Sequence, residues 1–268
     1  MKLLFLGDIV GKPGRKAVTQ HLPGLRQEFG IDFVVANAEN AAHGFGMTES
    51  NAEELFDAGC DVLTGGNHTW DKTEIIPLLE RDSRVLRPAN FPVGAPGKGA
   101  GLYETAAGQR VLVINILCRV FMDLYDDPFA ALDRLLPKDA PMRAGFDFVL
   151  VDMHGEASSE KYAIGHLCDG VASLVVGTHT HVPTGDAHIL AAGTGYQTDA
   201  GMCGTYDSVI GMDKHSALDR FLGRIPKPRL EVAEGEGTLC GVLLETDPAT
   251  GLARSIQPVR RGGVLQPV

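Results

Sequence analysis

Two histidines one residue apart, His179 and His181, follow an apolar, mostly β-branched run at 174–176. Such a run is typical of a buried strand, whose polar end would present two imidazoles at one edge of a sheet. Imidazole binds metal ions and exchanges protons near neutral pH. Taken alone, the pair fits an ordinary strand end with two polar residues equally well.

Four earlier strand-like segments also end in residues able to bind metal ions or protons. The segments are 2–7, 33–38, 61–66 and 148–153, and the residues that follow are Asp8, Glu39, Asn40, Asn67, His68 and His154. Ligands of open α/β sheets bind outside the carboxyl ends of the strands. We therefore expect the polar residues at all five strand ends to meet in one site.

The metal chemistry of this set points to more than one ion. It contains too many ligands for a single tetrahedral ion, and it has no thiolate. Mixed imidazole and oxygen donors favour iron, manganese or zinc over magnesium or calcium, and leave the order of the first three open. Two ions roughly 3.5–4 Å apart, bridged by a carboxylate, can hold a hydroxide and clamp the oxygens of a phosphoryl group. The set therefore predicts hydrolysis of a phosphate ester.

His68 directly follows a candidate ligand, Asn67, and adjacent side chains leave the backbone in different directions. We therefore assign His68 to the leaving oxygen as a general acid. A hydrogen-bonded structural histidine is the alternative. Of the other histidines, we expect His21, His166 and His215 on the surface, while His43 and His188 could line the cleft.

The elements that position these residues alternate between strand and helix, which predicts an α/β fold. The first expected helix follows a Gly- and Pro-rich loop at 9–15 and ends near Phe29. Further helices are expected at about 48–58, 72–81 with a boundary at Pro77, 126–136 and 158–168. Further expected strands cover 101–105 and 110–116 as a hairpin, then 188–190, 195–198, 239–246 and 255–259.

The domain organisation follows from the spread of the candidate ligands. They run from Asp8 to His181 and must converge, so we expect residues 1–268 to form a single domain. Helical patterns become rare after His181, so we expect the second sheet to be more antiparallel. The Gly-rich stretch 194–213 could be a lid, a subunit contact or packed coil.

Composition limits the class of protein. A net charge of −10 argues against wrapping or stably binding nucleic acid, which needs clustered Lys and Arg. No apolar run approaches the ~20 residues of a membrane span, and the start of the chain does not resemble a signal peptide. The five cysteines have no CxxC spacing, which disfavours a disulfide framework or a zinc knuckle. We expect a cytoplasmic protein that forms a homo-oligomer, since symmetric assembly is common.

The motifs also carry a resemblance. Asp8 and the segments 66–68 and 177–181, in that order, resemble the calcineurin-like metallophosphoesterases. More closely, the segments 7–11, 37–40, 66–71 and 198–202 resemble the bacterial YmdB-type branch of that superfamily. The resemblance extends over nearly the whole chain. Val10 and Glu39 depart from the wider superfamily, which usually has a histidine and an aspartate there, but both departures are shared by the YmdB-type branch. Thr69 replaces an acid that is common in the wider superfamily.

The resemblance implies a four-layer α/β/β/α sandwich with two divalent or trivalent metal ions, iron being favoured over manganese or zinc. It also implies phosphodiesterase activity on cyclic nucleotides, 2′,3′-cyclic ones in particular and 3′,5′-cyclic ones as a further possibility. Carried over by position, one ion would be held by Asp8, Glu39, Asn40 and His181, and the other by Glu39, Asn67, His154 and His179. The mechanism expected from this arrangement is attack by a metal-bridging hydroxide while His68 protonates the leaving ribose oxygen.

Two other functions stay open at this point. One is a phosphomonoesterase or protein phosphatase that uses the same metal centre. The other is a regulatory binding protein in RNA or nucleotide metabolism whose metal site no longer works. The complete ligand set disfavours the second, because a decayed site is expected to lose members.

Overall fold

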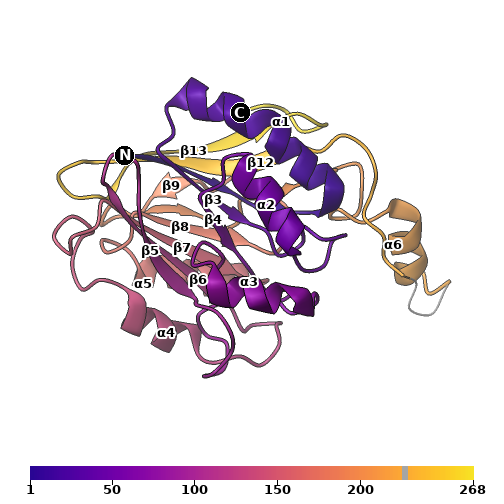
Figure 1. Ribbon diagram of the computed structural model, residues 1–268, viewed down its shortest axis with the longest axis horizontal. Coiled ribbons are helices and arrows are strands. Elements are labelled where there is room, and N and C mark those ends of the chain that lie inside the picture. The colour runs from indigo at the N-terminus through magenta and orange to yellow at the C-terminus, as the bar shows by residue number, and fades with distance from the viewer. Residues whose placement is uncertain (225–228) are drawn as a thin grey trace.

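The protein is described by a computed structural model in which residues 1–224 and 229–268 are placed (Figure 1). The first sheet has five strands in the order β13-β12-β1-β3-β4. The strands are β1 (Lys2–Leu6), β3 (Phe33–Asn37), β4 (Val62–Thr64), β12 (Leu239–Thr246) and β13 (Ala253–Arg261). β1, β3 and β4 run parallel, whereas β12 and β13 are antiparallel to their neighbours.

The second sheet has six strands in the order β5-β6-β7-β8-β10-β9. They are β5 (Ala100–Glu104), β6 (Arg110–Leu117), β7 (Phe148–His154), β8 (Leu174–Thr178), β9 (His188–Ile189) and β10 (Gly195–Gln197). The inner four strands are parallel, and the edge strands β5 and β9 are antiparallel. A separate parallel pair joins β2 (Asp8–Ile9) to β11 (Met202–Cys203).

Helices cover the outer faces of the two sheets (Figure 1). They are α1 (Gly11–Phe29), α2 (Glu49–Asp57), the short 3-10 helix η1 (Thr73–Ile75) with α3 (Ile76–Arg81), α4 (Pro128–Leu135), α5 (Ser158–Leu167) and α6 (Lys214–Phe221). α1, α2 and α3 pack on the first sheet, and α4 and α5 pack on the second. α6 projects from the side of the sandwich.

The side chains of a strand point alternately to its two faces, and both faces of the central strands are buried, which produces the layers. In β1, Leu4 and Leu6 belong to the apolar cluster shared with α1, α2 and α3. Leu3 and Phe5 point the other way, into the cluster between the two sheets. A third cluster lies between the second sheet and its helices. The order is therefore helix, sheet, sheet, helix, which confirms the predicted four-layer α/β/β/α sandwich.

Several local predictions are confirmed by the helix ends. Thr48 caps α2 and exchanges hydrogen bonds with Asn51 as a capping box. Asp127 caps α4, with Pro128 in its first turn. Pro77 lies at the start of α3, where the 3-10 helix gives way to an α-helix. In each case the sequence signal acts within a few residues.

Other predictions are wrong. The expected loop at 9–15 is helical from Gly11, because Pro13 lies in the first turn, where no intrahelical partner needs its missing N–H. The carboxyl-terminal strands do not build a more antiparallel second sheet: β12 pairs with β1 in the first sheet, and β8 and β10 extend the second sheet in parallel. β11 and α6 were not predicted.

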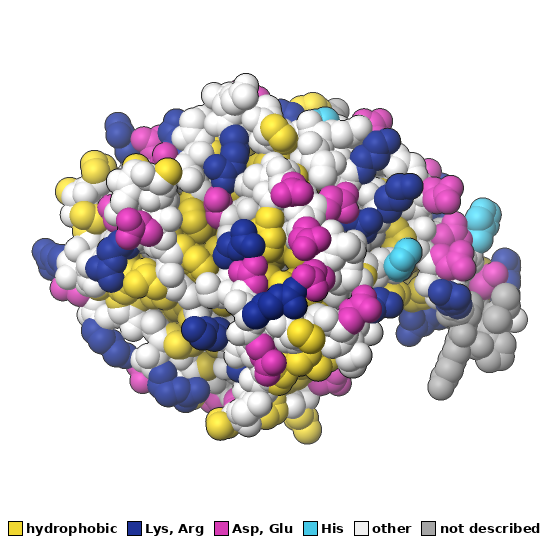
Figure 2. Space-filling view, in the orientation of Figure 1, with side chains coloured by type: hydrophobic (Ala, Val, Ile, Leu, Met, Phe, Trp, Pro, Cys, Tyr) yellow, Lys and Arg dark blue, Asp and Glu magenta, His cyan; other side chains and the backbone are white. Residues whose placement is uncertain are grey.

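The surface in view carries side chains of both charges. Figure 2 shows acidic and basic side chains interspersed over the described part of the face in view, without one broad basic area. Within residues 1–224 and 229–268, no helix is both long and apolar enough to cross a membrane.

Candidate active site

The predicted residues meet where β3, β4, β7 and β8 end. Glu39 and Asn40 follow β3, Asn67 and His68 follow β4, His154 ends β7, His179 and His181 follow β8, and Asp8 begins β2. Five of the eight line a cavity of about 470 Å³: Glu39, Asn40, His68, His179 and His181. The other three do not line the cavity: Asp8 and His154 are buried, and Asn67 is half-buried. The structure thus brings all eight together.

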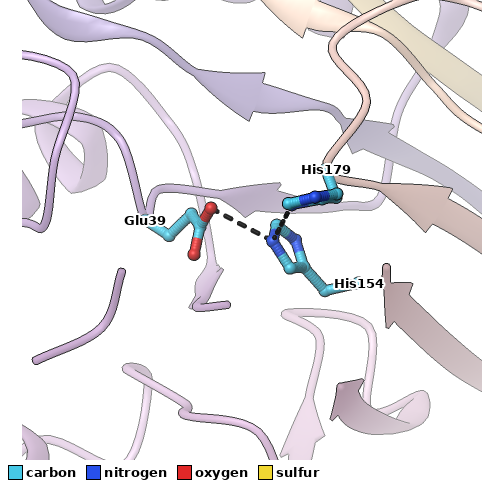
Figure 3. Close-up of side chains that lie close together, drawn as sticks. All are labelled: Glu39, His154 and His179. Atoms are coloured by element: carbon cyan, nitrogen blue, oxygen red, sulfur yellow. Dashed lines mark hydrogen bonds and ion pairs between the residues drawn. The ribbon is translucent and has the colours of Figure 1, made fainter. Parts of the chain in front are cut away.

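Three candidate ligands converge on the Nε2 atom of His154, and Figure 3 draws two of them, Glu39 and His179, together with His154. That nitrogen lies 3.1 Å from Oε1 of Glu39 and 3.1 Å from Nδ1 of His179. The Oδ1 atom of Asn67 is 2.9 Å away. Atoms bound at about 2.1 Å to one octahedral ion are themselves about 3 Å apart, so the spacing fits a shared ion. Glu39, His154 and His179 form a group that could hold a metal ion.

Glu39 and His154 each stabilise the charged form of the other. Burial alone would raise the pKa of Glu39, but the adjacent imidazolium of His154 lowers that pKa to about 2. Burial opposes charge on His154, yet Glu39 and Asp8 raise the pKa of His154 to about 9. Burial and the charge on His154 lower the pKa of His179 to about 3. The proton on His154 thus occupies a place suited to a cation, and metal binding there would release that proton.

The remaining candidate ligands have polar atoms without partners. The Oδ1 atoms of Asp8 and Asn40 are buried and make no hydrogen bond within the described parts of the chain. His181 donates from Nδ1 to the carbonyl of Ile210 at 2.8 Å, and its Nε2 lies 3.9 Å from Oδ1 of Asp8. Burial raises the pKa of Asp8. An uncompensated buried carboxylate oxygen is costly, so these three side chains fit a second cation.

The backbone between the two histidines is strained. His179 has φ 97° and His181 has φ 65°, a region that non-glycine residues rarely adopt. Such residues cost on the order of 1–3 kcal/mol each and persist only where the surroundings impose them. Asp8 contributes to this, since its Oδ2 accepts a hydrogen bond from the His179 N–H at 3.0 Å. In this conformation Nδ1 of His179 lies 3.1 Å from Nε2 of His154, and Nε2 of His181 lies 3.9 Å from Oδ1 of Asp8.

A buried ion pair that the sequence analysis missed supports this turn. Lys161 on α5 and Asp199 are fully buried, with Nζ and Oδ2 2.9 Å apart. Lys161 also donates to the carbonyl of Thr178 at 2.7 Å. Asp199 accepts hydrogen bonds from the backbone N–H and the hydroxyl of Thr180 at 3.1 and 2.8 Å. In the sequence, the only indication that either residue of this pair matters was the presence of Asp199 in the motif at 198–202.

A second missed residue, Asp152, orients His154. Its carboxylate accepts hydrogen bonds from the hydroxyls of Thr64 and Thr178 at 2.6 and 2.8 Å. The Thr178 hydroxyl lies 2.9 Å from Nδ1 of His154, which leaves Nε2 to face Glu39. Burial raises the pKa of Asp152 to about 6. Partners of this kind fix the ring orientation of a ligating histidine.

His68 lies at the cavity wall, apart from the converging ligands. Its Nδ1 is 2.8 Å from Oδ2 of Asp71, and its backbone N–H donates to Oε2 of Glu39 at 2.8 Å. The ring packs edge-to-face on Phe45, with centroids 5.1 Å apart. With Nδ1 engaged by Asp71, Nε2 is the nitrogen left for a proton transfer.

The other histidines do not belong to the cavity. His43 is exposed and lines a neighbouring hollow with Lys12 and Arg229, and His188 is exposed beside the carbonyl of Asp186. Of the two alternatives for these residues, the structure therefore favours exposed positions outside the cavity. His166 and His215 are exposed as predicted, whereas His21 is half-buried.

The stretch 194–213 packs into the sandwich. It contains β10 and β11, and Tyr196 is completely buried. Ile210 and Met212 contribute to the cavity wall. Most of this stretch is therefore packed, and a subunit contact through it stays a prediction.

Comparison with known proteins places the chain in a family. A family model described as YmdB-like protein matches residues 4–259. The chain belongs to the YmdB-like family. A Bacillus subtilis member named 2′,3′-cyclic-nucleotide 2′-phosphodiesterase is 45% identical over 259 residues, which cover 97% of this chain and 96% of that protein. The resemblance stated from the motifs is thereby confirmed.

Two solved structures share the fold of this YmdB-like chain. A hypothetical protein from Thermus thermophilus is 44% identical with a TM-score of 0.90, covering 98% of this chain and 100% of that one. A structure described as a novel phosphatase from Mycoplasma pneumoniae is 31% identical with a TM-score of 0.89, covering 98% and 93%. Both likenesses span the whole sandwich, including the elements that deliver the candidate ligands.

Proposed function

We propose that this YmdB-like chain is a metal-dependent hydrolase of phosphate esters that acts on cyclic nucleotides, 2′,3′-cyclic ones in particular. The observation that carries the proposal is the group of ligand atoms spaced about 3 Å around Nε2 of His154, beside the unpartnered oxygens of Asp8 and Asn40. The name of the Bacillus subtilis relative supports the substrate class. Activity on 3′,5′-cyclic nucleotides is a narrower proposal that rests on the resemblance alone.

Two metal ions fit this site. Glu39, Asn67, His154 and His179 would hold one ion, and Asp8, Glu39, Asn40 and His181 the other, with Glu39 shared. Bound ions would place positive charge near the phosphoryl oxygens and acidify a water molecule. The neutral-imidazole and oxygen donors suit iron, manganese or zinc, and we favour iron from the resemblance.

A side chain of the protein donates the proton to the leaving oxygen. His68 is on the cavity wall with Nε2 unengaged by the described residues, so it can protonate the ribose oxygen as its bond to phosphorus breaks. Asp71 holds Nδ1–H and stabilises the imidazolium before transfer. The glycine at 66 lets this strand end approach the ligands closely, since a Cβ there would lie 2.2 Å from Oε2 of Glu39.

The test is elemental analysis of protein purified without added metal, with hydrolysis of 2′,3′-cyclic AMP measured on the same sample. We expect about two transition-metal ions per chain and turnover of the cyclic diester. Parallel assays with 3′,5′-cyclic AMP and with p-nitrophenyl phosphate separate the narrower diesterase proposal from a phosphomonoesterase. Metal-free protein that stays inactive after iron, manganese or zinc is restored would overturn the proposal.

Three broader proposals accompany this function. Five free, buried cysteines suit a reducing compartment, which supports a cytoplasmic location. The homo-oligomer stays a prediction, as does the assignment of residues 1–268 to one domain. Light scattering on the purified protein measures the oligomeric state directly.

A further inference from the structure

The cavity is lined by two chemically different groups of residues. One group comprises candidate metal ligands and His68. The other group is apolar and comprises Phe45, Val182, Ile210, Met212 and Leu230. Ligand cavities commonly combine an apolar wall with a few convergent polar groups, and the wall then recognises the part of the ligand that does not react.

The apolar wall is a packed structure. Phe45, Met212 and Leu230 belong to one cluster that also includes buried Val10 and Met202. Gly44, with φ 86°, permits this packing, because a Cβ there would lie 2.9 Å from Cε of Met212. Phe45 thus packs against this cluster, is half-buried and lines the cavity.

We propose that Phe45, with Met212 and Leu230, forms the subsite for the base of a cyclic nucleotide. The inference rests on the proposed function and narrows it, because it assigns the part of the substrate that the metal ligands do not touch. Aromatic side chains stack on bases of any sequence, since every base has a π-face. A nucleoside cyclic phosphate is the matching ligand, with an anion at one end and a flat apolar ring at the other.

The position of Phe45 suits this role. Its ring lies 5.1 Å from the ring of His68, centroid to centroid. In a 2′,3′-cyclic nucleotide the base is attached to the carbon next to C2′, so the base and the reacting diester are separated by only one sugar bond. A side chain that binds the base must therefore lie close to the groups that act on the phosphate, as Phe45 does.

The experiment compares two cyclic diesters. 2′,3′-Cyclic AMP carries a base, whereas glycerol 1,2-cyclic phosphate has the same five-membered cyclic diester without one. For Phe45→Ala we expect the ratio of kcat/KM for the two substrates to fall about 10-fold or more, through a higher KM for 2′,3′-cyclic AMP. Phe45→Tyr and Phe45→Trp should restore the ratio, because both keep a stacking surface.

Phe121→Ala is the matched control, since Phe121 is 87% exposed and is not among the residues lining the cavity. Equal losses on both substrates for Phe45→Ala would show that Phe45 only supports His68, and unchanged kcat/KM on both substrates would show that Phe45 does not contribute. Either outcome would overturn the subsite. Calorimetric binding of adenosine 3′-monophosphate, compared with glycerol 2-phosphate, tests the subsite without turnover. Wild-type protein that hydrolyses neither diester would overturn the proposed function, while this binding comparison would still decide the role of Phe45.

Discussion

His68 is the residue whose role depends most on its immediate neighbours. Asp71 engages one ring nitrogen, Phe45 packs against the ring, and Glu39 fixes the backbone N–H. None of these contacts uses Nε2. A general acid needs such an unengaged nitrogen at the cavity wall, together with a carboxylate that stabilises the protonated ring.

Replacement of His68 by alanine should therefore slow turnover without removing metal. We expect kcat on 2′,3′-cyclic AMP to fall by about 10²–10⁴-fold, which is typical for loss of a general acid. Metal content from elemental analysis should stay at the wild-type value. His215→Ala is the control, because His215 is exposed on α6. A His68→Ala protein with wild-type kcat would remove the acid assignment.

Gly66 is the second residue whose replacement is informative. A Cβ at this position would lie 2.2 Å from Oε2 of Glu39 and 2.6 Å from Nε2 of His154. Gly66→Ala should therefore displace the ligands and lower metal content and activity, while far-ultraviolet circular dichroism stays native. Gly24→Ala is the matched control, because nothing lies within 4 Å of a Cβ at Gly24 within α1. Normal metal content in Gly66→Ala would contradict the close packing inferred here.

At the scale of elements, α5 and the segment after β10 hold the turn that carries His179 and His181. Lys161 and Asp199 meet beneath this turn and bind the backbone at Thr178 and Thr180. Breaking a buried pair leaves one charge without compensation, which costs about 3–5 kcal/mol. The pair thus couples the helix to the metal-binding loop.

Lys161→Met should lower the free energy of unfolding by about 3–5 kcal/mol, measured by urea denaturation. The double variant Lys161→Met with Asp199→Leu should recover part of that loss, because no buried charge then lacks a partner. Its activity should stay low, since Thr180 loses its acceptor. Full recovery of activity in the double variant would show that the pair does not position the histidines.

At the scale of the whole molecule, the four layers bury every cysteine. Burial raises the pKa of the Cys60, Cys118 and Cys168 thiols to about 12 and that of Cys240 to about 11, and it also raises the pKa of Cys203. The thiolate is the reactive form, and it is populated only as the pH approaches the pKa. At pH 8 all five side chains are therefore protonated and shielded.

Native protein should accordingly give almost no reaction with Ellman's reagent at pH 8. After unfolding in guanidinium chloride, all five thiols should react, because their pKa values return to about 8.5. Rapid labelling of a thiol in the native protein would show local opening of the layer that contains it. The count after unfolding serves as the internal control.

The sequence by itself determined the features that depend on near neighbours. Apolar, mostly β-branched runs marked the strands, Thr48 and Asp127 marked helix starts, and polar residues after the apolar runs identified all eight candidate site residues. The convergence of those residues followed from one general property, that parallel strands present their carboxyl ends at one edge of a sheet. These signals each depend on a few neighbouring residues, so they can be recognised from the sequence alone.

Only the tertiary structure decided which segments pair and what supports the site. The residues of an apolar strand do not specify which other strand it pairs with. The sequence therefore could not show that β12 pairs with β1. Lys161 and Asp199 are separated by 38 residues and look like ordinary charged residues until both are buried. Phe45 and Met212 reach one cavity wall from distant segments for the same reason. Long-range packing sets these contacts, and it is a property of the whole chain rather than of any stretch of it.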